Sequence, residues 1–304
     1  MSDDIEVPLI PDCSACIVDA MKTLVPLLTD DKDKQYELFN LVYKRLSEGY
    51  AKNLTPLVLS VKIHQELYER EGIENPYREI KRQSNEAALK VLPLVEERIG
   101  KLKGRERFQA CLVASITGNV IDFNVGEHKP DLDLLVDVFD EIQKDGFALD
   151  DSDYLWKSLT DRTGKLLFLA DNAGEFILDI PLLRFLKELG WKTTFVVKGR
   201  AMINDATLED IQGTEIEELA TVTDSGAWAH GVPKEFVSKE FLALFAESDL
   251  IISKGQANIE SVPEIQQMTG VETYYITKAK CSHISQAVGA VKGDNVVLRR
   301  PPLP

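Results

Sequence analysis

The sequence has few cysteines, no long hydrophobic run and no excess of basic residues, and each of these absences excludes a class of protein. Only four of its 304 residues are cysteines, too few and too scattered for a disulfide framework, so we expect free thiols. No apolar run approaches the ~18 residues of a membrane span, and no basic-then-apolar leader opens the chain, which predicts a cytoplasmic protein without membrane attachment. Acidic residues number 50 against 35 basic ones, a formal charge of −15. This charge repels nucleic-acid backbones, so nucleic acid is not an expected partner.

Several catalytic and nucleotide-binding signatures are missing as well. The chain has neither the Gly-x-x-x-x-Gly-Lys-Ser/Thr loop nor the Gly-x-Gly-x-x-Gly fingerprint, which disfavours nucleotide binding of those kinds. The four histidines, His64, His128, His230 and His283, have no serine or cysteine elbow with which to form a catalytic triad. We therefore expect no catalytic role for them.

What the sequence does contain is enough apolar residues, 44%, to build one large core or two ordinary ones. Up to about residue 160, apolar positions recur every three or four residues, which is the period of a helix. This pattern predicts helices at 14–28, 33–51, 55–70, 78–100, 105–118 and 132–145. The first part of the chain, residues 1–160, is thus predicted to be an all-helical subdomain.

From residue 161 onward the pattern changes to short apolar runs that alternate with helical stretches. Such alternation predicts a parallel sheet with covering helices, because strands buried on both faces are hydrophobic throughout. The expected strands are 166–170, 193–197, 216–221, 250–253, 273–277 and 296–298. The expected helices lie near 175–190, 205–212, 234–247, 260–269 and 283–290.

Oxygen-bearing side chains follow two of these strands. Asp-Asn-Ala-Gly-Glu occupies 171–175, and Asn-Asp-Ala-Thr occupies 204–207. Ligands of open α/β sheets gather at the carboxyl ends of strands, so Asp171, Asn172 and Asp205 could together hold Mg²⁺ or Mn²⁺. The alternative for each segment is simple capping of the helix that follows.

A candidate phosphate cradle follows strand 250–253. Lys254, Gly255, Gln256 and Asn258 would place a cation, a flexible residue and two amides where backbone N–H groups at a helix start favour an anion. Lys278 and Lys280 follow the last long strand and add positive charge at the same edge. For these two the alternative is a pair of ordinary surface lysines.

Two motifs in the helical part are ambiguous. Asn119 and Asp122 lie three residues apart and could face a cleft, or could simply end the helix at 105–118. Cys13 and Cys16 form a Cys-x-x-Cys pair, half of a four-thiolate zinc site. Because no second pair completes such a site, we expect them to be structural thiols.

Taken together and in order, these pieces resemble the damage-control phosphatase family, long catalogued as domain of unknown function 89. The resemblance rests on Asp-Asn-Ala-Gly-Glu, Asn-Asp-Ala-Thr, Lys-Gly-Gln-Ala-Asn and Lys-Ala-Lys-Cys at successive strand ends, and spans nearly the whole chain. It includes Asn75-Pro76-Tyr77 with Lys81 and Asn85, and the Gly-Asn-Val-Ile-Asp-Phe segment at 118–123. The Cys-x-x-Cys pair is similar to that of the archaeal and bacterial branch.

The resemblance implies a helical subdomain on a Rossmann-like α/β/α sandwich of residues 161–304 that binds metal and phosphate. It implies Mg²⁺, Mn²⁺, Co²⁺ or Ni²⁺ at Asp171, Asn172 and Asp205. It also implies hydrolysis of phosphate esters of small, often damaged, metabolites. The phosphate-binding stretch carries over to 254–258, and the later lysine to Lys278 or Lys280.

The expected mechanism is attack by water activated by the metal, with Asp171 or Glu175 orienting it or taking its proton. A covalent aspartyl-phosphate at Asp171 is the competing mechanism, disfavoured because Asp-x-Asp is absent at this strand end. Two other functions stay open: a methyltransferase that uses S-adenosylmethionine, and a non-enzymatic protein that binds phosphorylated metabolites. The physiological substrate and the oligomeric state have no readable signal in the sequence.

Overall fold

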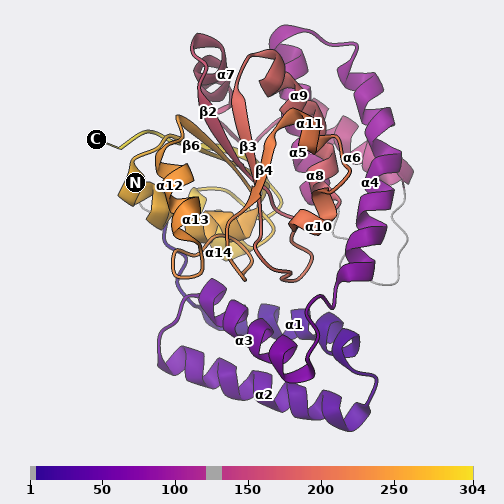
Figure 1. Ribbon diagram of the computed structural model, residues 1–304, viewed down its shortest axis with the longest axis vertical. Helices are drawn as coiled ribbons and strands as arrows, with labels where there is room; N and C mark the ends of the chain where they lie inside the picture. The colour runs from indigo at the N-terminus through magenta and orange to yellow at the C-terminus, as the bar shows by residue number, and fades with distance from the viewer. Residues whose placement is uncertain (1–4, 121–131, 304) are drawn as a thin grey trace.

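A computed structural model describes residues 5–120 and 132–303, and Figure 1 shows the arrangement of their helices and strands. The helices are α1 (Pro11–Leu28), α2 (Lys32–Ala51), α3 (Pro56–Glu71), α4 (Arg78–Ile99), α5 (Gly104–Val120), α6 (Leu132–Asp145), α7 (Ser152–Asp161), α8 (Glu175–Leu178), α9 (Ile180–Glu188), α10 (Leu208–Ile211), α11 (Ile216–Leu219), α12 (Lys239–Ala246), α13 (Gln256–Thr269) and α14 (Ser282–Val288). The strands are β1 (Leu149–Asp150), β2 (Lys165–Leu169), β3 (Lys192–Val197), β4 (Thr221–Asp224), β5 (Leu250–Lys254), β6 (Thr273–Lys278) and β7 (Asn295–Arg300).

The strands form one seven-stranded sheet in the order β1-β7-β6-β5-β2-β3-β4. All neighbouring strands pair in parallel except β6 and β7, which are antiparallel. The chain runs outward from β2 to β3 and β4, then returns to the other side of β2 to form β5. The reversal of strand order makes the carboxyl ends of β2 and β5 a topological switch point, the place where open α/β sheets bind ligands.

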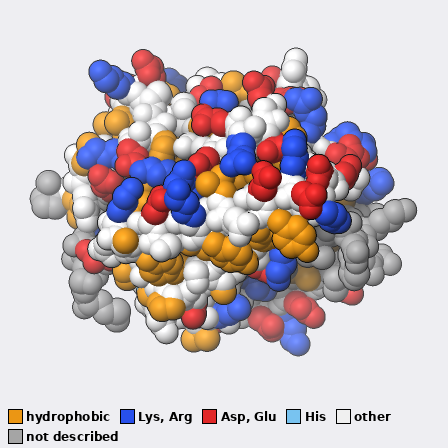
Figure 2. Space-filling view, turned by 90° about the horizontal axis from the view of Figure 1, so that it is seen from below, with side chains coloured by type: hydrophobic (Ala, Val, Ile, Leu, Met, Phe, Trp, Pro, Cys, Tyr) orange, Lys and Arg blue, Asp and Glu red, His pale blue; other side chains and the backbone are white. Residues whose placement is uncertain are grey.

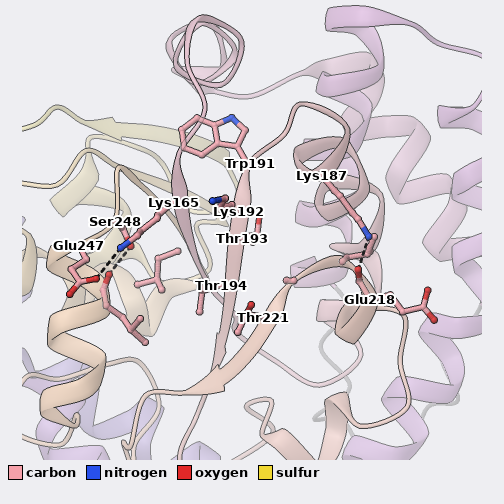
Figure 3. A pocket seen from close by; sticks show the side chains of 14 residues that line it. Lys165, Lys187, Trp191, Lys192, Thr193, Thr194, Glu218, Thr221, Glu247 and Ser248 are labelled. Carbon is pink, nitrogen blue, oxygen red and sulfur yellow. Dashed lines mark hydrogen bonds and ion pairs between the residues drawn. The ribbon is translucent and has the colours of Figure 1, made fainter.

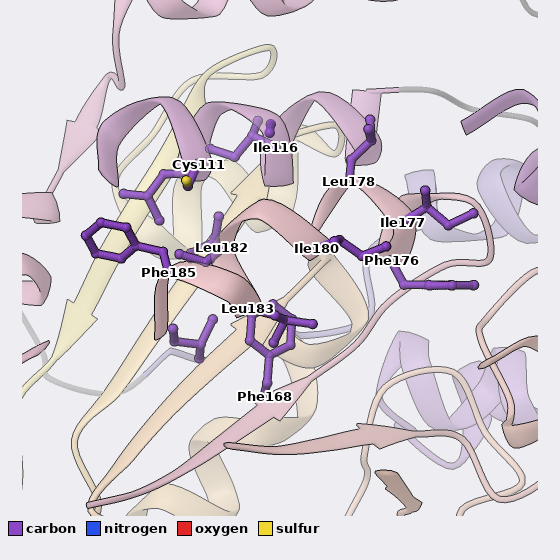
Figure 4. Close-up of a cluster of buried hydrophobic side chains, with 14 of the residues drawn as sticks. Cys111, Ile116, Phe168, Phe176, Ile177, Leu178, Ile180, Leu182, Leu183 and Phe185 are labelled. Carbon is purple, nitrogen blue, oxygen red and sulfur yellow. The ribbon is translucent and has the colours of Figure 1, made fainter. Parts of the chain in front are cut away.

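Both faces of the sheet are apolar, as predicted for strands buried between two layers of helices. Leu166, Phe168 and Ala170 belong to one hydrophobic cluster, whereas Leu167 and Leu169 belong to the cluster on the opposite face. This division follows from the two-residue period of a strand. Figure 4 shows the first cluster, where side chains of β2, α5, α8 and α9 point toward one another. The protein is therefore a three-layer α/β/α sandwich with a mainly parallel sheet.

Helices α1, α2 and α3 lie at the bottom of Figure 1, beneath the sheet, and share a hydrophobic cluster of their own. Helices α4 to α7 instead share the large cluster of the sheet, through residues such as Val91, Phe108, Phe139 and Leu155. The division of the sequence at residue 160 marks where strands begin to alternate with helices. The hydrophobic clusters instead separate α1 to α3 from α4 to α7, which pack with the sheet.

The predicted strand at 216–221 is wrong. The structure has the short helix α11 at Ile216–Leu219, and β4 begins only at Thr221. Ile216 is buried, and Glu217 and Glu218 are exposed. The apolar residues at 216 and 219 are three residues apart, which is the spacing of a helical turn, but so short a segment can also be read as a strand. The short strand β1 and helix α7 were not predicted.

Two predicted helices begin later than expected, and a capping side chain marks each start. Helix α10 begins at Leu208, directly after the capping box formed by Thr207 and Asp210. Helix α12 begins at Lys239 because the Ser238 side chain accepts a hydrogen bond from the Phe241 backbone N–H. In place of helix, residues 204–206 form part of the site described below.

The lower face of the molecule carries charges of both signs. Figure 2 shows lysine, arginine, aspartate and glutamate side chains interspersed on this face, among hydrophobic ones. Mixed signs do not create the broad basic field that attracts nucleic acid. None of the described helices has the length and apolar character needed to cross a membrane.

His64 makes stability depend on pH. Its ring, on α3, is fully buried, and burial lowers its pKa to about 4. The folded protein therefore keeps this ring neutral, while the unfolded chain takes up a proton below about pH 6.5. The stabilisation is fully present above pH 6.5 and is lost as the pH falls toward 4.

We expect this loss to reach roughly 3 kcal/mol at pH 4. Urea unfolding of the wild type and of His64→Gln across pH 4–7.5 measures it as the difference between the two proteins. A difference that stays constant across this range would contradict the prediction.

Candidate active site at the carboxyl edge of the sheet

Two backbone segments, residues 171–173 and 204–206, lie side by side just beyond β2 and β3. The Ala206 N–H donates to the Asp171 carbonyl (2.9 Å), and the Ala173 N–H donates to the Asn204 carbonyl (2.8 Å). Between these hydrogen bonds, Asn172 and Asp205 form an isolated antiparallel bridge. The structure therefore brings Asp171, Asn172 and Asp205, which come from two loops, to one point at the edge of the sheet.

Asp171 and Asp205 are buried, and burial makes the charged form of each carboxyl group unfavourable. Burial raises the pKa of Asp171 well above its ordinary value, and the nearby Glu175 and Asp205 carboxylates raise it further. Burial likewise raises the pKa of Asp205 to about 6, although the Lys198 ammonium opposes the shift. Clustered carboxylates of this kind favour any cation that can share their charge.

Two details bear on what such a cation would meet. Asp205 Oδ2 lies 3.5 Å from Lys198 Nζ, an ion pair, but is buried and accepts no hydrogen bond from the described residues. The Asn172 amide nitrogen donates to Asp171 Oδ2 (2.9 Å) and Glu175 Oε2 (3.2 Å), so it lies between two carboxylates. No three His, Cys, Asp or Glu side chains in the described residues form a ready-made metal cluster. The donors gathered here are instead two aspartates and an amide.

Lys254, at the end of β5, is fully buried, and its three N–H donors all have acceptors. Nζ donates to Glu175 Oε1 (2.8 Å), to Asp179 Oδ1 (2.7 Å) and to the Ser115 carbonyl (3.0 Å). This geometry argues against the direct contact with a phosphoryl group predicted from the sequence, because no donor is left for it. Lys254 instead neutralises carboxylates beneath the site.

Gly255 allows β2 and β5 to approach at the switch point. Its backbone has φ +79°, and a Cβ atom built on it would lie 2.0 Å from Asp171 Oδ2. Leu169 of β2 pairs with Ser253 of β5. Asp171 lies two residues after Leu169, and Gly255 lies two residues after Ser253, so the two are neighbours across the strands. The carboxylate occupies the space that any other side chain would need.

Gly255→Ala should therefore abolish or strongly reduce catalysis, because the new methyl group displaces the Asp171 carboxylate. Gly289→Ala is the matched control: Gly289 also has φ +79°, but nothing lies within 4 Å of its added Cβ. Both variants should lose about 1 kcal/mol from the positive φ, and only Gly255→Ala should lose more than ~10-fold in kcat/KM. Equal activity of the two variants would contradict this account.

The other residues of the predicted phosphate cradle have different surroundings. Gln256 Oε1 accepts hydrogen bonds from the backbone N–H groups of Lys280 (3.1 Å) and Cys281 (3.0 Å), so it holds the loop after β6. Asn258 is buried, with Nδ2 on the Lys254 carbonyl (2.7 Å) and Oδ1 without a hydrogen-bond partner among the described residues. The charge of Lys280 lowers the pKa of Asp171. Among the causes of the Asp171 pKa shift, Lys280 is the one of the two candidate lysines that appears.

The side chains of two further predicted positions are not among those that the structure describes. Asp122 lies outside the described residues, and Asn119 belongs to α5 but its side chain is not described. Gly118 packs against Glu175, since an added Cβ would lie 3.0 Å from three atoms of that residue.

Several residues that support the site were not identified from the sequence. Asp179 and Ser115 hold Lys254, and their side chains hydrogen-bond each other at 2.5 Å. The signal for Asp179 is readable: it is the only charged residue in the apolar run 176–183. Lys198 donates to the Ala170 carbonyl (2.8 Å). Asn85, predicted from the sequence only as part of the family resemblance, accepts a hydrogen bond from the Gly174 N–H at its Oδ1 (2.6 Å). These groups fix the loop that carries Asp171.

A separate hollow lies at the opposite, amino ends of the strands and is shown in Figure 3. Two of its three lysines are already engaged: Lys165 pairs with Glu247 (3.0 Å), and Lys187 donates to the Glu218 carbonyl (2.7 Å). The hollow lacks the clustered buried carboxylates of the carboxyl edge, and we assign it no role.

The fold and the site define a Rossmann-like α/β/α protein with an acidic centre at its switch point, and comparisons with known proteins identify the family. The family described as the damage-control phosphatase ARMT1-like domain matches residues 9–296. A damage-control phosphatase of Pyrococcus horikoshii is 32% identical, over 95% of this chain and 96% of its own length. A damage-control phosphatase of Archaeoglobus fulgidus is 31% identical, over 94% of this chain and 97% of its own.

Other relatives agree. An uncharacterized protein of Methanocaldococcus jannaschii is 33% identical over 95% of both chains. The crystal structure of a DUF89 family protein of Pyrococcus horikoshii superposes with a TM-score of 0.85 at 31% identity, covering 96% of this chain and 99% of that one. The chain belongs to the damage-control phosphatase (DUF89) family, as its strand-end motifs predicted. Membership in this family supports a phosphatase.

Proposed function

We propose that this protein is a divalent-metal-dependent phosphatase that hydrolyses phosphate monoesters of small, possibly damaged, metabolites. Asp171, Asn172 and Asp205 would hold Mg²⁺, Mn²⁺, Co²⁺ or Ni²⁺. The observation that carries the proposal is the backbone pairing of 171–173 with 204–206. This pairing gathers two buried aspartates and an amide at the switch point of a phosphatase-family fold.

The residues fit a hard divalent cation. Oxygen donors suit such ions, the raised pKa values of Asp171 and Asp205 report carboxylates short of positive charge, and Asp205 Oδ2 lacks a hydrogen bond from the described residues. A rotation of the Asn172 amide group by a half turn would direct its oxygen, in place of its nitrogen, toward the cation. When bound, the cation supplies positive charge beside the phosphoryl group and lowers the pKa of water there.

The protein's own groups position and deprotonate the nucleophile. Glu175 is buried and held by Lys254 at one carboxylate oxygen and Asn172 at the other. We propose that Glu175 or Asp171 orients the attacking water and takes its proton. Lys280 would contact a phosphoryl oxygen, because its charge acts on Asp171 and it has no ion-pair partner among the described residues. Gly255, Gln256 and Asn258 would shape the phosphate cradle. Lys254 would keep the Glu175 and Asp179 carboxyl groups ionised.

Turnover should depend on the metal. Exhaustive dialysis against chelator should lower the hydrolysis of p-nitrophenyl phosphate to background, and added Mn²⁺, Co²⁺, Ni²⁺ or Mg²⁺ should restore it. A screen of phosphorylated metabolites with each ion then defines specificity. Full activity after chelation would refute the metal-dependent mechanism, and absence of turnover with every ion and ester would refute the phosphatase itself.

Stereochemistry separates the two possible chemical routes. Direct attack by water inverts the configuration at phosphorus, whereas a covalent aspartyl-phosphate at Asp171 involves two displacements and retains it. We expect inversion with a chiral, isotopically labelled phosphate ester.

A further inference from the structure

A cavity of about 640 Å³ lies where helices α1, α13 and α14 and the start of α3 meet. Its volume falls within the range of roughly 300–1,000 Å³ typical of sites that hold whole small molecules. Its lining comes from segments far apart in the sequence, including Ile17 of α1, Leu57 of α3, Glu260 of α13 and Ile284 of α14.

The cavity borders the proposed active site. Gln256, which lines it, directly follows Gly255, the residue that abuts Asp171. Lys280 also lines it, and the charge of this lysine acts on Asp171. The backbone hydrogen bonds from Lys280 and Cys281 to Gln256 hold this boundary in place. A molecule with one end near Asp171 could therefore extend past Lys280 into the cavity.

Besides Lys280, the lining has two charged residues of opposite sign, Asp12 and Lys292, and both are exposed. The buried polar groups of the lining are uncharged at neutral pH. Burial raises the pKa of Glu260 to about 8, so its carboxyl group keeps its proton. Burial also raises the pKa values of Cys13 and Cys16, and the neighbouring Cys281 adds to both shifts, so these groups remain thiols. His230 is neutral because burial lowers its pKa to about 3. The cavity offers no interior charge to a second anionic group.

Two of these polar groups also lack partners. Glu260 Oε2 and His230 Nδ1 are buried atoms without hydrogen-bond partners among the described residues. Such atoms are costly unless a ligand or water satisfies them. The buried apolar side chains of Ile17, Leu57 and Ile284 line the same cavity.

We propose that this cavity binds the uncharged organic portion of the phosphate monoester, with the phosphoryl group at the Lys280 end. The inference rests on the proposed phosphatase function and narrows its substrate class. It favours esters whose organic portion is bulky, partly apolar and able to hydrogen-bond. It disfavours esters with a second phosphate or carboxylate, and very small ones.

A cavity-filling variant with a matched control tests the proposal. Cys16 lines the cavity from an exposed position on α1, and its neighbour Ala15 is also exposed but does not line it. Cys16→Trp should raise KM for p-nitrophenyl phosphate about tenfold or more and leave kcat/KM for glycerol phosphate within about twofold. Ala15→Trp should change neither. Equal effects of Cys16→Trp on both esters, or no effect on either, would overturn the proposal.

A second measurement does not require turnover. Phenylphosphonate, a non-hydrolysable analogue, should slow the alkylation of Cys16 by N-ethylmaleimide, followed by mass spectrometry, whereas inorganic phosphate should not. Equal rates with the two anions would overturn the proposal even if the protein proves to be a phosphatase. Protection without turnover of any ester would sustain the cavity as a binding site and refute only the enzymatic function.

Discussion

Asp171→Asn is expected to lower kcat/KM by about 10³-fold or more, a loss of ~4 kcal/mol in transition-state stabilisation. The substitution keeps the size of the side chain and leaves an oxygen to accept the hydrogen bond from Asn172. It removes the charge that would hold the cation and help to position the nucleophile. The measurement is steady-state kinetics on p-nitrophenyl phosphate at saturating metal.

The same variant should not be less stable than the wild type. Burial and the neighbouring carboxylates disfavour the charge on Asp171, so a neutral side chain relieves a cost that the active site imposes. We expect an equal or higher melting temperature in metal-free buffer. Activity lost together with stability would indicate misfolding instead.

Asp224→Asn provides the control for Asp171→Asn. Asp224 ends β4 at the same edge of the sheet, but its carboxylate caps a turn by accepting the Gly226 N–H (2.7 Å). It should retain activity within about twofold. A comparable loss in both variants would remove the special role of Asp171.

Lys254→Met is expected to lower the free energy of unfolding by about 3–5 kcal/mol, because it removes the ammonium group that neutralises the buried carboxylates of Glu175 and Asp179. Burial already raises the pKa of Asp179 to about 6 in the presence of Lys254. A raised carboxyl pKa destabilises the folded state increasingly as the pH rises above the unfolded value. The penalty of Lys254→Met should therefore be larger at pH 8 than at pH 5, as measured by urea unfolding.

Two further variants make the test specific. Lys165→Met removes an exposed ion pair with Glu247, the residue that follows α12, and should cost less than about 1 kcal/mol. Adding Asp179→Asn to Lys254→Met removes one of the two buried carboxylates that lost the Lys254 ammonium, so the double variant should be more stable than Lys254→Met alone. Additive losses in the double variant would contradict the buried network.

The strength of each sequence signal explains what could be predicted. Helices α1 to α6 follow long periodic patterns, and they lie within a few residues of the predicted ranges. The segment 216–221 was too short for its period to separate a helical turn from a strand. The antiparallel direction of β7 has no local signal, because pairing direction depends on how the preceding loop returns.

The site shows the same division. Asp171, Asn172 and Asp205 are visible because oxygen-bearing residues follow apolar strands. The carboxylate partners of Lys254 cannot be predicted from the sequence. A lysine at a strand end has the same sequence signature whether its ammonium group contacts a ligand or a buried carboxylate. Cys281 likewise gave no sign of lying beside Cys13 and Cys16, which are more than 200 residues away in the chain.

The amino-acid sequence alone determined the class of fold, the strand ends that carry the chemistry and the family resemblance, because these depend on local periodicity and on short motifs in order. The tertiary structure alone decided which charges neutralise one another, why Gly255 must lack a side chain, and which helices enclose the cavity beside Lys280. Those properties depend on distances between segments remote in the chain, which burial and strand order set only when the whole molecule is packed.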